Sequence, residues 1–517
     1  MKRFLVLALV AVSALGAAQY PRYGVRLLSH IGLPDFPGTP TTGAAIFGYT
    51  SPSGREYATI GLRNGTGIVE ITNPTVPVQV AHVPGPVTLW HENVVMGNYC
   101  YAVTDSTGIG IQIIDLSNVD SGVVEVDAIY AGNNMATVHT IQADPVTQRL
   151  FANGGTRNFA ILDASNPTAL TEIGRWTTKY VHDSVIRNFT SGPNAGKQIA
   201  YLCCGTAGLY IVDVTDPANI IPKGILNYYP GAANEGKFYC HSASLSPDGR
   251  HLMVHDEFDE NQNITGSCTT IVVDVSNIEA PTVADRFESG INTIDHNSSL
   301  RDGFLFLAAY KAGVRVYNAS NPLNLSEVGF FDTYPASTND NSYNGNWGVY
   351  AQFPSGNVVL SDIDDGFFVV DPTEAMGLGA PLTGSNLSSL SGIGTLAMLR
   401  RSDDQRAFIR HFRKQPLRVF AETTISPRTA VTARLEANGN GTLVLAIKNQ
   451  LTGSFVSVGS LTLGATDTTL TVNGLASAAY VTSTGQIEAE VRHSSGPIQD
   501  VDTLRVNIDT VSFHVSP

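Results

Sequence analysis

The segment GLYIVDVTDP, residues 208–217, is one of seven related segments that recur along the chain. In its full form the pattern has a glycine, an apolar run rich in Val and Ile, an acidic residue, and then Ser or Thr with Asn or Asp, often followed by Pro. The other copies are GIVEITNP (67–74), GIQIIDLSN (110–118), FAILDASNP (159–167), TIVVDVSN (270–277), GVRVYNASNP (313–322) and GFFVVDP (366–372). The apolar run predicts a buried strand, and the polar residues after it predict a turn closed by short side chains.

The copies follow one another at intervals of about 44 to 61 residues, which suits one four-stranded blade per copy. The sequence therefore predicts an all-β protein with a seven-bladed β-propeller over residues 19–378. The last copy has no clear strand after it, but residues 24–32, GVRLLSHIG, are similar to the strands that end the other blades. We expect this N-terminal strand to close the seventh blade, because closure leaves no free sheet edge. The alternative is an isolated edge strand.

The two ends of the chain differ from the repeat region. Lys2 and Arg3 precede an apolar run, residues 4–15, and three small residues, 16–18. This pattern predicts a signal peptide over residues 1–18 and a secreted or cell-envelope protein, with a retained N-terminal anchor as the alternative. No later apolar run is long enough to predict a membrane span. Residues 379–394 are typical of a linker, and alternating strands over residues 395–517 predict a small accessory β-sandwich.

Charge and cysteine content narrow the function classes. Residues 19–390 carry 17 Lys and Arg against 35 Asp and Glu, a net charge of −18, within a whole-chain value of −14. So acidic a repeat region excludes nucleic acid as a partner, because phosphate binding needs basic side chains. An extracellular protein, a glycan or a small ligand is the expected partner. The five cysteines, an odd number, leave at least one thiol without a disulfide partner within the chain and show no CxxC zinc spacing.

Five histidines occupy one position of the repeat, where the first and innermost strand of a blade is expected to begin. They are His91 in WHE, His139 in VHT, His182 in VHD, His241 in CHS and His296 in DHN. The seventh blade has NWG (346–348) there, and the first has the apolar GAAIFGY (43–49). In an up-and-down blade the second turn returns to the same face, so Asp105, Glu257, Tyr310 and Asp364 should lie near this ring of imidazoles.

Three interpretations of the ring stay open. Neutral imidazoles that converge on a channel mouth are ligands for a transition metal, with Glu92, Asp183 and Asp295 as further ligands, orienting groups or bases. The ring is alternatively structural, each His bonding a neighbouring blade, since duplication copies structural residues as easily as ligands. Catalysis is the third interpretation.

The acidic loop HDEFDENQN (255–263) is a second candidate site. It holds His255, Asp256, Glu257, Asp259 and Glu260. Carboxylate oxygens are the ligands that Ca²⁺ prefers, although the spacing is not that of an EF-hand. A solvated acidic loop is the plainer interpretation.

Most of residues 22–376 resemble the choice-of-anchor B family of secreted bacterial proteins, most specifically in the second half, and the repeat itself resembles the LVIVD repeat. The resemblance rests on HDEFDE (255–260), DVSNIEAP (274–281), IDHN (294–297), AGVRVYNAS (312–320), FFDTYP (330–335), NGNWGVYAQFPSG (344–356) and SDIDDGFFVVDP (361–372). It implies an extracellular or envelope propeller of unestablished activity, so it supplies no catalytic residues. An LPxTG-like anchoring motif is missing from this sequence.

The sequence contains no GxSxG, HExxH, Walker A or Rossmann motif. We therefore expect a secreted or cell-surface binding module rather than an enzyme. The module is expected to bind its ligand through the face that carries the histidines and the acidic loop. The alternative is a metal-dependent enzyme with a His-ligated ion at the channel mouth.

Overall fold

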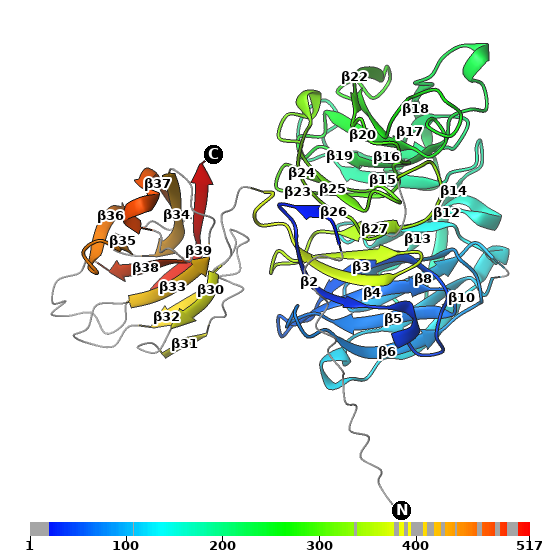
Figure 1. Cartoon of the computed structure of the whole chain (residues 1–517). Coiled ribbons are helices and arrows are strands. Elements are labelled where there is room, and N and C mark those ends of the chain that lie inside the picture. The colour runs from blue at the N-terminus through cyan, green and yellow to red at the C-terminus, as the bar shows by residue number, and fades with distance from the viewer. Residues whose placement is uncertain are drawn as a thin grey trace, which may run out of the picture.

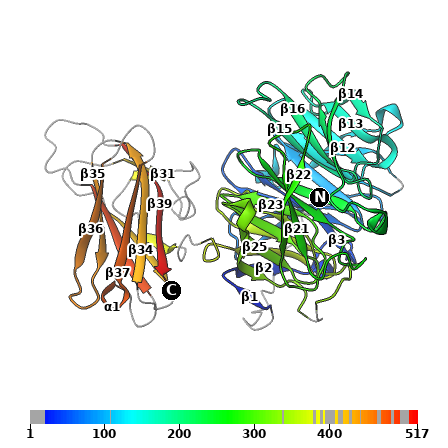
Figure 2. The same ribbon diagram turned by 90° about the horizontal axis from the view of Figure 1, so that it is seen from above.

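The computed structural model describes residues 20–376, apart from residue 107 and residues 336–338, and farther along the strand segments between residues 382 and 516. Within residues 20–376 the protein is all-β and forms a seven-bladed β-propeller (Figures 1 and 2). Each blade is one antiparallel sheet, in which consecutive strands are neighbours. Short 3₁₀ turns connect some strands: η1 (Leu33–Asp35), η2 (Val119–Ser121), η3 (Gly132–Asn134), η4 (Gly155–Arg157), η5 (Ala232–Asn234) and η6 (Pro322–Asn324).

The first strands of the seven blades surround the propeller axis. Each contacts the first strand of the next blade in a closed cycle that returns from the seventh blade to the first. They are β3 (Gly43–Thr50), β7 (His91–Met96), β11 (Thr140–Asp144), β15 (Asp183–Asn188), β19 (Cys240–Leu245), β23 (Ser298–Arg301) and β27 (Asn346–Tyr350).

The second and third strands of each blade form its buried middle. The second strands are β4 (Glu56–Leu62), β8 (Tyr99–Thr104), β12 (Arg149–Gly154), β16 (Gln198–Cys203), β20 (His251–Asp256), β24 (Phe304–Ala308) and β28 (Val358–Asp362). The third strands are β5 (Gly65–Glu70), β9 (Ile111–Asp115), β13 (Asn158–Asp163), β17 (Leu209–Asp213), β21 (Thr269–Asp274), β25 (Val314–Asn318) and β29 (Gly366–Asp371). The core lies between adjacent blades, where for example Ile211 of β17 and Ile271 of β21 join one buried cluster.

The third strands are the seven repeated segments, and each ends on the acidic residue or Asn of the repeat. The turn after the strand is closed as the sequence predicts. Asp163 Oδ1 accepts a hydrogen bond from the backbone N–H of Ser165 at 2.8 Å, and Asp213 Oδ1 accepts from Thr215 at 3.1 Å. The same bond forms at Asp115, Asp274, Asn318 and Asp371. Glu70, whose side chain is longer, accepts instead from the guanidinium of Arg55.

The outer strands share one irregularity. They are β6 (Val78–Pro84), β10 (Glu125–Tyr130), β14 (Thr171–Trp176), β18 (Ile221–Leu226), β22 (Thr282–Glu288) and β26 (Ser326–Phe331), and in the seventh sheet β2 (Arg26–Ile31). Each pairs with its third strand through a register shift near the middle, and the pairing of β2 with β29 has this shift between Leu27 and Ser29. Figure 1 shows β2 in blue among the yellow-green strands of the last blade. The short strand β1 (Arg22–Tyr23) pairs with β26 of the sixth sheet.

The described C-terminal segments are also strands. They form two five-stranded sheets with the orders β30-β33-β38-β35-β36 and β31-β32-β39-β34-β37. The elements are β30 (Leu382–Asn386), β31 (Ser391–Ile393), β32 (Ala407–Arg410), β33 (Arg418–Thr424), β34 (Ala430–Gly439), β35 (Thr442–Lys448), β36 (Phe455–Thr462), β37 (Thr468–Ala476), α1 (Ser477–Tyr480), β38 (Gln486–His493) and β39 (Arg505–Ser516). Strands β30 and β31 fall within residues 379–394, where the sequence predicts a linker.

Candidate binding site at the channel mouth

The five repeated histidines lie where the innermost strands begin. His91 is the first residue of β7 and His241 the second of β19, while His139 and His182 directly precede β11 and β15 and His296 lies two residues before β23. All five side chains are buried. Because these strands line the axis, the histidines of neighbouring blades are brought together at one end of the channel.

Four of the five form a continuous row of contacting rings across blades three to six; we call this row the stack, although its rings are tilted or edge-on to one another and not parallel. The ring centroids of His139 and His182 are 4.2 Å apart, those of His182 and His241 4.1 Å, and those of His241 and His296 4.2 Å. The stack continues into blade seven, where the Trp347 ring lies 4.8 Å from His296. The seventh blade therefore has an aromatic residue at the position that carries histidine in the preceding five blades.

Backbone carbonyls of the next blade orient two of these rings. His182 Nδ1 lies 2.9 Å from the carbonyl oxygen of His241, and His296 Nδ1 lies 2.6 Å from that of Trp347. A carbonyl oxygen only accepts, so both Nδ1 atoms donate, and each Nε2 of the neutral ring carries a lone pair. This arrangement is typical of metal-ligating histidines, in which the second nitrogen is held by an acceptor.

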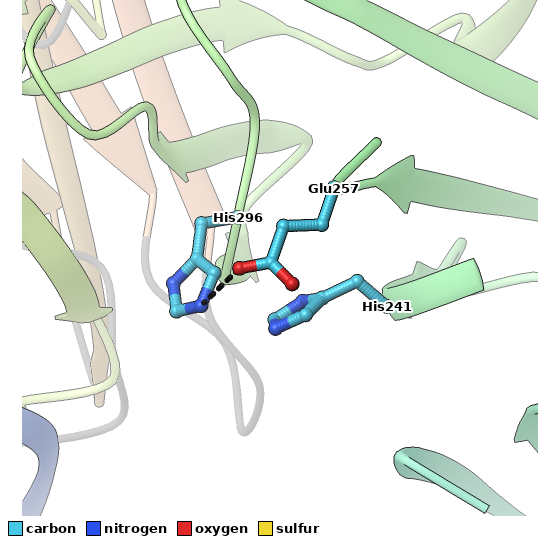
Figure 3. A group of neighbouring side chains, drawn as sticks. All are labelled: His241, Glu257 and His296. Atoms are coloured by element: carbon cyan, nitrogen blue, oxygen red, sulfur yellow. Dashed lines mark ion pairs between the residues drawn. The ribbon is translucent and has the colours of Figure 1, made fainter. Parts of the chain in front are cut away.

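Glu257 supplies a carboxylate to the same site. It follows the last residue of β20, in the second turn of blade five, and its Oε1 lies 3.8 Å from His296 Nε2. Figure 3 shows this carboxylate beside the rings of both His241 and His296. One ligand atom from each of the three residues lies within 4.8 Å of the others. We call His139, His182, His241, His296 and Glu257 the channel-mouth site.

Burial shifts the protonation of these groups. Loss of solvent lowers the pKa of His296 to about 3, and lowers that of His182 and His241 well below the usual value. Burial raises the pKa of Glu257 to about 7, opposed by the hydroxyl of Tyr310, which donates to Oε1 at 2.7 Å. Near neutral pH these three rings are therefore uncharged and can offer lone pairs to a cation. The Nδ1 atom of His241 is buried without a hydrogen-bond partner.

Glu92 and Asp183 lie near the same axis but form different hydrogen bonds. Trp347 Nε1 donates to Glu92 Oε1 at 3.0 Å, which joins blade seven to blade two across the mouth. Burial raises the pKa of Glu92 to about 8. Asp183 accepts from Gln142 Nε2 at 2.9 Å and from Thr140 Oγ1 at 3.2 Å, and it lines the channel below the histidines.

His91 does not join the stack, although it holds the same place in the repeat. Its Nε2 lies 2.6 Å from the carbonyl oxygen of Pro86, so this nitrogen donates and has no lone pair for a metal. Gly85 makes room for the ring, because a Cβ there would lie 2.9 Å from His91 Cε1. The expectation of five convergent histidines is therefore wrong for His91, which closes a local loop instead.

The acidic loop is not one site, and Asp295 does not join the histidine ring. Glu257 points to the histidines, whereas Asp259 and Glu260 lie with Asp295, their ligand atoms within 4.8 Å of one another. His255 Nδ1 contacts Asp295 Oδ2 at 3.1 Å, and its Nε2 contacts Ser298 Oγ at 2.8 Å. We call Asp259, Glu260 and Asp295 the buried carboxylate cluster. All three are buried, so a solvated acidic loop is excluded for them.

Asp256 serves the loop itself. Its Oδ1 accepts from the backbone N–H groups of Phe258 and Asp259, both at 3.0 Å, and its Oδ2 accepts from the hydroxyl of Tyr228 at 2.7 Å. With these bonds and one from the N–H of Tyr239 at 2.8 Å, the carboxylate fixes the path of the chain after β20. Its role is structural.

Exposed aromatic rings stand around the mouth. Trp90 lines the cavity at the channel-mouth site, Tyr180 lies beside His139 at Gly154, and the ring centroid of Tyr343 lies 5.4 Å from that of Tyr310. Their exposed fractions are 44%, 39% and 44%. The cavity at the site has a volume of about 30 Å³, and the channel cavity lined by the innermost strands has about 510 Å³. We call Trp90, Tyr180 and Tyr343 the aromatic rim.

Sequence reasoning missed part of this arrangement. The rim residues stand in connections of irregular length, and no repeat marks them. The sequence held one signal for the contact between Trp347 and Glu92, because the segment NWG (346–348) stands where blades two to six have histidine. Asp105 was expected on this face from its turn, and its Oδ2 lies 2.9 Å from His139 Nδ1.

A family model described as the LVIVD repeat matches residues 155–178 and 199–227, which fall on strands of the third and fourth blades. The chain is a seven-bladed β-propeller with LVIVD repeats in its third and fourth blades. No curated protein matches it. One similar solved structure is the extracellular domain of a hybrid two-component system protein from B. thetaiotaomicron, with 11% identity and a TM-score of 0.43. The match covers 78% of the propeller protein described here and 46% of the two-component system chain. The present protein therefore spans about half the length of that bacterial chain. Within the described residues, no helix is both long and apolar enough to cross a bilayer.

Proposed function

We propose that this propeller is a secreted or cell-envelope binding module that engages an extracellular protein, glycan or small ligand through the aromatic rim. A divalent transition-metal ion, held beneath the rim by the channel-mouth site, organises that face. The observation that carries the proposal is the stack of four buried histidines with a carboxylate at its edge. Imidazole and carboxylate together suit zinc, copper or iron.

The state of the ring nitrogens supports a cation. His182 donates from Nδ1, and so does His139 when Asp105 is ionised, because a carboxylate only accepts. Their Nε2 atoms then face each other at 2.6 Å with two lone pairs between them. Such a contact is repulsive unless a proton lies between the nitrogens, and a metal ion would require the two rings to separate to about 3.3 Å, the spacing of two nitrogen ligands on one tetrahedral ion.

The surroundings of the site support ligand binding. Trp90, Tyr180 and Tyr343 expose flat, partly polar rings of the kind that contribute most to recognition surfaces. The net negative charge of the repeat region favours cations and cationic ligands near this mouth.

A metal-dependent enzyme is less well supported. A catalytic ion keeps a coordination position open for substrate, but a cavity of about 30 Å³ holds little more than an ion and a water molecule. The tight stack suits an ion that is held rather than one that turns over substrate.

The decisive experiment is metal analysis of protein purified without a His-tag, followed by calorimetric titration of the EDTA-treated protein with Zn²⁺ and with Cu²⁺. We expect one tightly bound ion per chain. The double variant His182→Ala/His241→Ala should lose it, while His82→Ala, a partly buried histidine outside the site, should keep it. Parent protein that binds neither ion would refute the metal site.

The ligand face is tested separately with a glycan array and a panel of extracellular proteins. Labelled protein carrying Trp90→Ala and Tyr180→Ala should lose at least about tenfold in affinity for any partner found. Tyr23→Ala is the matched control, because Tyr23 is 60% exposed on the edge strand β1. Equal loss in all variants would argue against the rim.

The proposal includes the ends of the chain. Residues 1–18, outside the described residues, would be the export signal, and the resemblance to the choice-of-anchor B family supports an envelope location. We also propose that β2 closes the seventh blade, supported by the register shift that it shares with the outer strands of the other six. Residues 395–517 would form an accessory β-sandwich, supported by their two five-stranded sheets.

A further inference from the structure

The buried carboxylate cluster is separate from the channel-mouth site. Asp259 and Glu260 lie in the loop between β20 and β21 of blade five, and Asp295 lies in the connection from β22 to β23 of blade six. Asp259 and Asp295 are fully buried, and Glu260 is 2% exposed. Three carboxyl groups from two blades therefore meet where water is excluded.

Two oxygens of the cluster have no hydrogen-bond partner. Glu260 Oε1 accepts from the backbone N–H of Thr269 at 3.1 Å, but no N–H or O–H group donates to its buried Oε2, and the Glu260 carboxyl group otherwise contacts the Asp259 carboxyl group, with which it can share a proton. Asp295 Oδ2 contacts His255 Nδ1 at 3.1 Å, but its Oδ1 is likewise buried and unpaired. An unpaired buried carboxylate oxygen is costly, and two of them in one cluster indicate a missing partner.

The protein does not supply that partner as a charge. His255 is fully buried and its pKa is lowered to about 3 by loss of solvent, so it is neutral at physiological pH. The positive charge of Arg286 acts on Asp259, but its guanidinium lies over the Tyr229 ring, 4.6 Å from the ring centre, and one arginine cannot balance three carboxylates; the Tyr229 hydroxyl donates to Asp259 at 2.7 Å. Burial and the neighbouring carboxylates raise the pKa of Glu260 and of Asp295. Protons or a cation must therefore neutralise the cluster.

We propose that Asp259, Glu260 and Asp295 bind one Ca²⁺ ion, which ties the acidic loop of blade five to the entry of blade six. Calcium takes oxygen ligands at about 2.3–2.6 Å, so ligands on opposite sides of the ion lie about 4.6–5.2 Å apart. The three ligand atoms lie within 4.8 Å of one another. Carboxylate oxygens suit Ca²⁺ better than the imidazole-rich mouth does, and the two sites thus select different ions.

The ion would have a consequence for the mouth. Glu257 lies between Asp256 and Asp259 in the chain, and His296 follows Asp295 directly. Calcium would therefore hold in place the two backbone segments from which Glu257 and His296 reach the channel-mouth site. The calcium site does not depend on the proposed transition metal, because the two share no ligand.

The test uses the full-length protein treated with EDTA and titrated with Ca²⁺ by calorimetry, with terbium luminescence as a second signal. We expect one ion per chain, and a thermal midpoint that rises by about 5 °C when Ca²⁺ is present at 100 times its Kd. Glu260→Gln and Asp295→Asn should lose the calcium response, and in EDTA they should unfold no earlier than the parent, because an amide replaces a protonated carboxyl group.

Two controls separate this site from the channel mouth. Glu125→Gln, an exposed carboxylate on β10, should keep full Ca²⁺ binding. His182→Ala should keep Ca²⁺ binding while losing Zn²⁺. Parent protein that takes up no Ca²⁺ after EDTA treatment would overturn the proposal and assign the charge balance to protons. If both cluster variants fail to fold, calcium uptake by the parent decides the question in the same way.

Discussion

His139 and His182 approach each other through their Nε2 atoms, 2.6 Å apart, from the entries of two neighbouring innermost strands. The opposite side of each ring is fixed, by the Asp105 carboxylate for His139 and by the carbonyl of His241 for His182. Neither ring can turn its lone pair away without losing a bond. While Asp105 is ionised, the pair therefore needs a proton or a cation at its facing nitrogens, and this requirement makes the mouth of the propeller chemically distinctive.

Asp105 should act as a positioning residue for this pair. The variant Asp105→Asn keeps the shape but removes the negative charge beside His139 Nδ1. We expect the affinity for Zn²⁺ to fall about tenfold or more, as for other residues that orient metal ligands. Calorimetric titration measures the change, with Asp216→Asn in an exposed turn as the control. An unchanged Kd would show that His139 takes no part in binding.

Trp347→Phe should destabilise the ring of blades by removing the hydrogen bond to Glu92. The control is Trp176→Phe, which removes the same side-chain volume from a buried tryptophan between two other blades. We expect Trp347→Phe to cost about 1–2 kcal/mol more than the control in free energy of unfolding, because Glu92 keeps no indole donor. Urea denaturation of both variants measures the difference, and equal losses would show that the bond contributes nothing.

The metal-free protein should lose stability between pH 6.5 and pH 8. The buried histidines whose pKa is lowered act in the opposite direction, because the unfolded chain still holds about half a proton on each ring at pH 6.5, and this opposing contribution fades above about pH 7.5. Several buried carboxyl groups have a pKa raised on folding and stay protonated in the native state after the unfolded chain has lost the proton. They are Glu92, with a pKa of about 8, and Asp256, Glu257 and Asp362, each with a pKa of about 7.

Their stabilising contribution is present at low pH and is lost as the pH rises through these values. Each excess native proton changes the free energy of unfolding by about 1.4 kcal/mol per pH unit. Urea denaturation in EDTA at the two pH values tests the sign. A free energy of unfolding that stays constant or rises would contradict the assignment.

Most of the fold could be predicted from the repeat, because each strand and the turn after it depend on residues that are neighbours in the sequence. Asp163, Asp213 and Asp274 mark the ends of third strands, since each needs only its own neighbours to close the turn. The entry of His182 and His241 into the innermost strands follows from the same periodicity.

The side chains of the acidic loop could not be assigned in the same way. Glu257 and Asp259 are two residues apart, yet they serve different sites, because the loop folds between two blades and Asp256 sets its path. His91 shows the same limit. Its ring is turned by the carbonyl of Pro86, in a connection that belongs to no repeat.

All five cysteines are free and buried in the described residues. Burial raises the pKa of Cys100 to about 12 and that of Cys268 well above the usual value, which suppresses the reactive thiolate. We expect Ellman's reagent to modify none of them in the native protein at pH 8 and all five in guanidinium chloride without reductant. Fewer than five in the denatured protein would reveal a disulfide.

Removal of the N-terminal strand should open the last blade. A chain that begins at Leu33 lacks β2, exposes the edge of β29 and loses the buried side chains of Val25 and Ile31. We expect its thermal midpoint to fall by on the order of 10 °C and its tendency to aggregate to rise. A chain that begins at Gln19 is the control, and differential scanning calorimetry compares them. Equal midpoints would show that β2 is dispensable.

The pairing of β2 with β29 also sets an order in time. Arg26 lies opposite Asp371, so β2, which is synthesised before any strand of the first blade, finds its partner only when more than two thirds of the polypeptide has been made. Until then β2 has no strand to pair with and Leu27 lacks its neighbours in blades six and seven, whereas Ile31 shares a buried cluster with Ile46 of the first blade. Such long-range pairing is slow to form. During synthesis the protein therefore carries β2 as an unpaired strand until β29 of the last blade has been made.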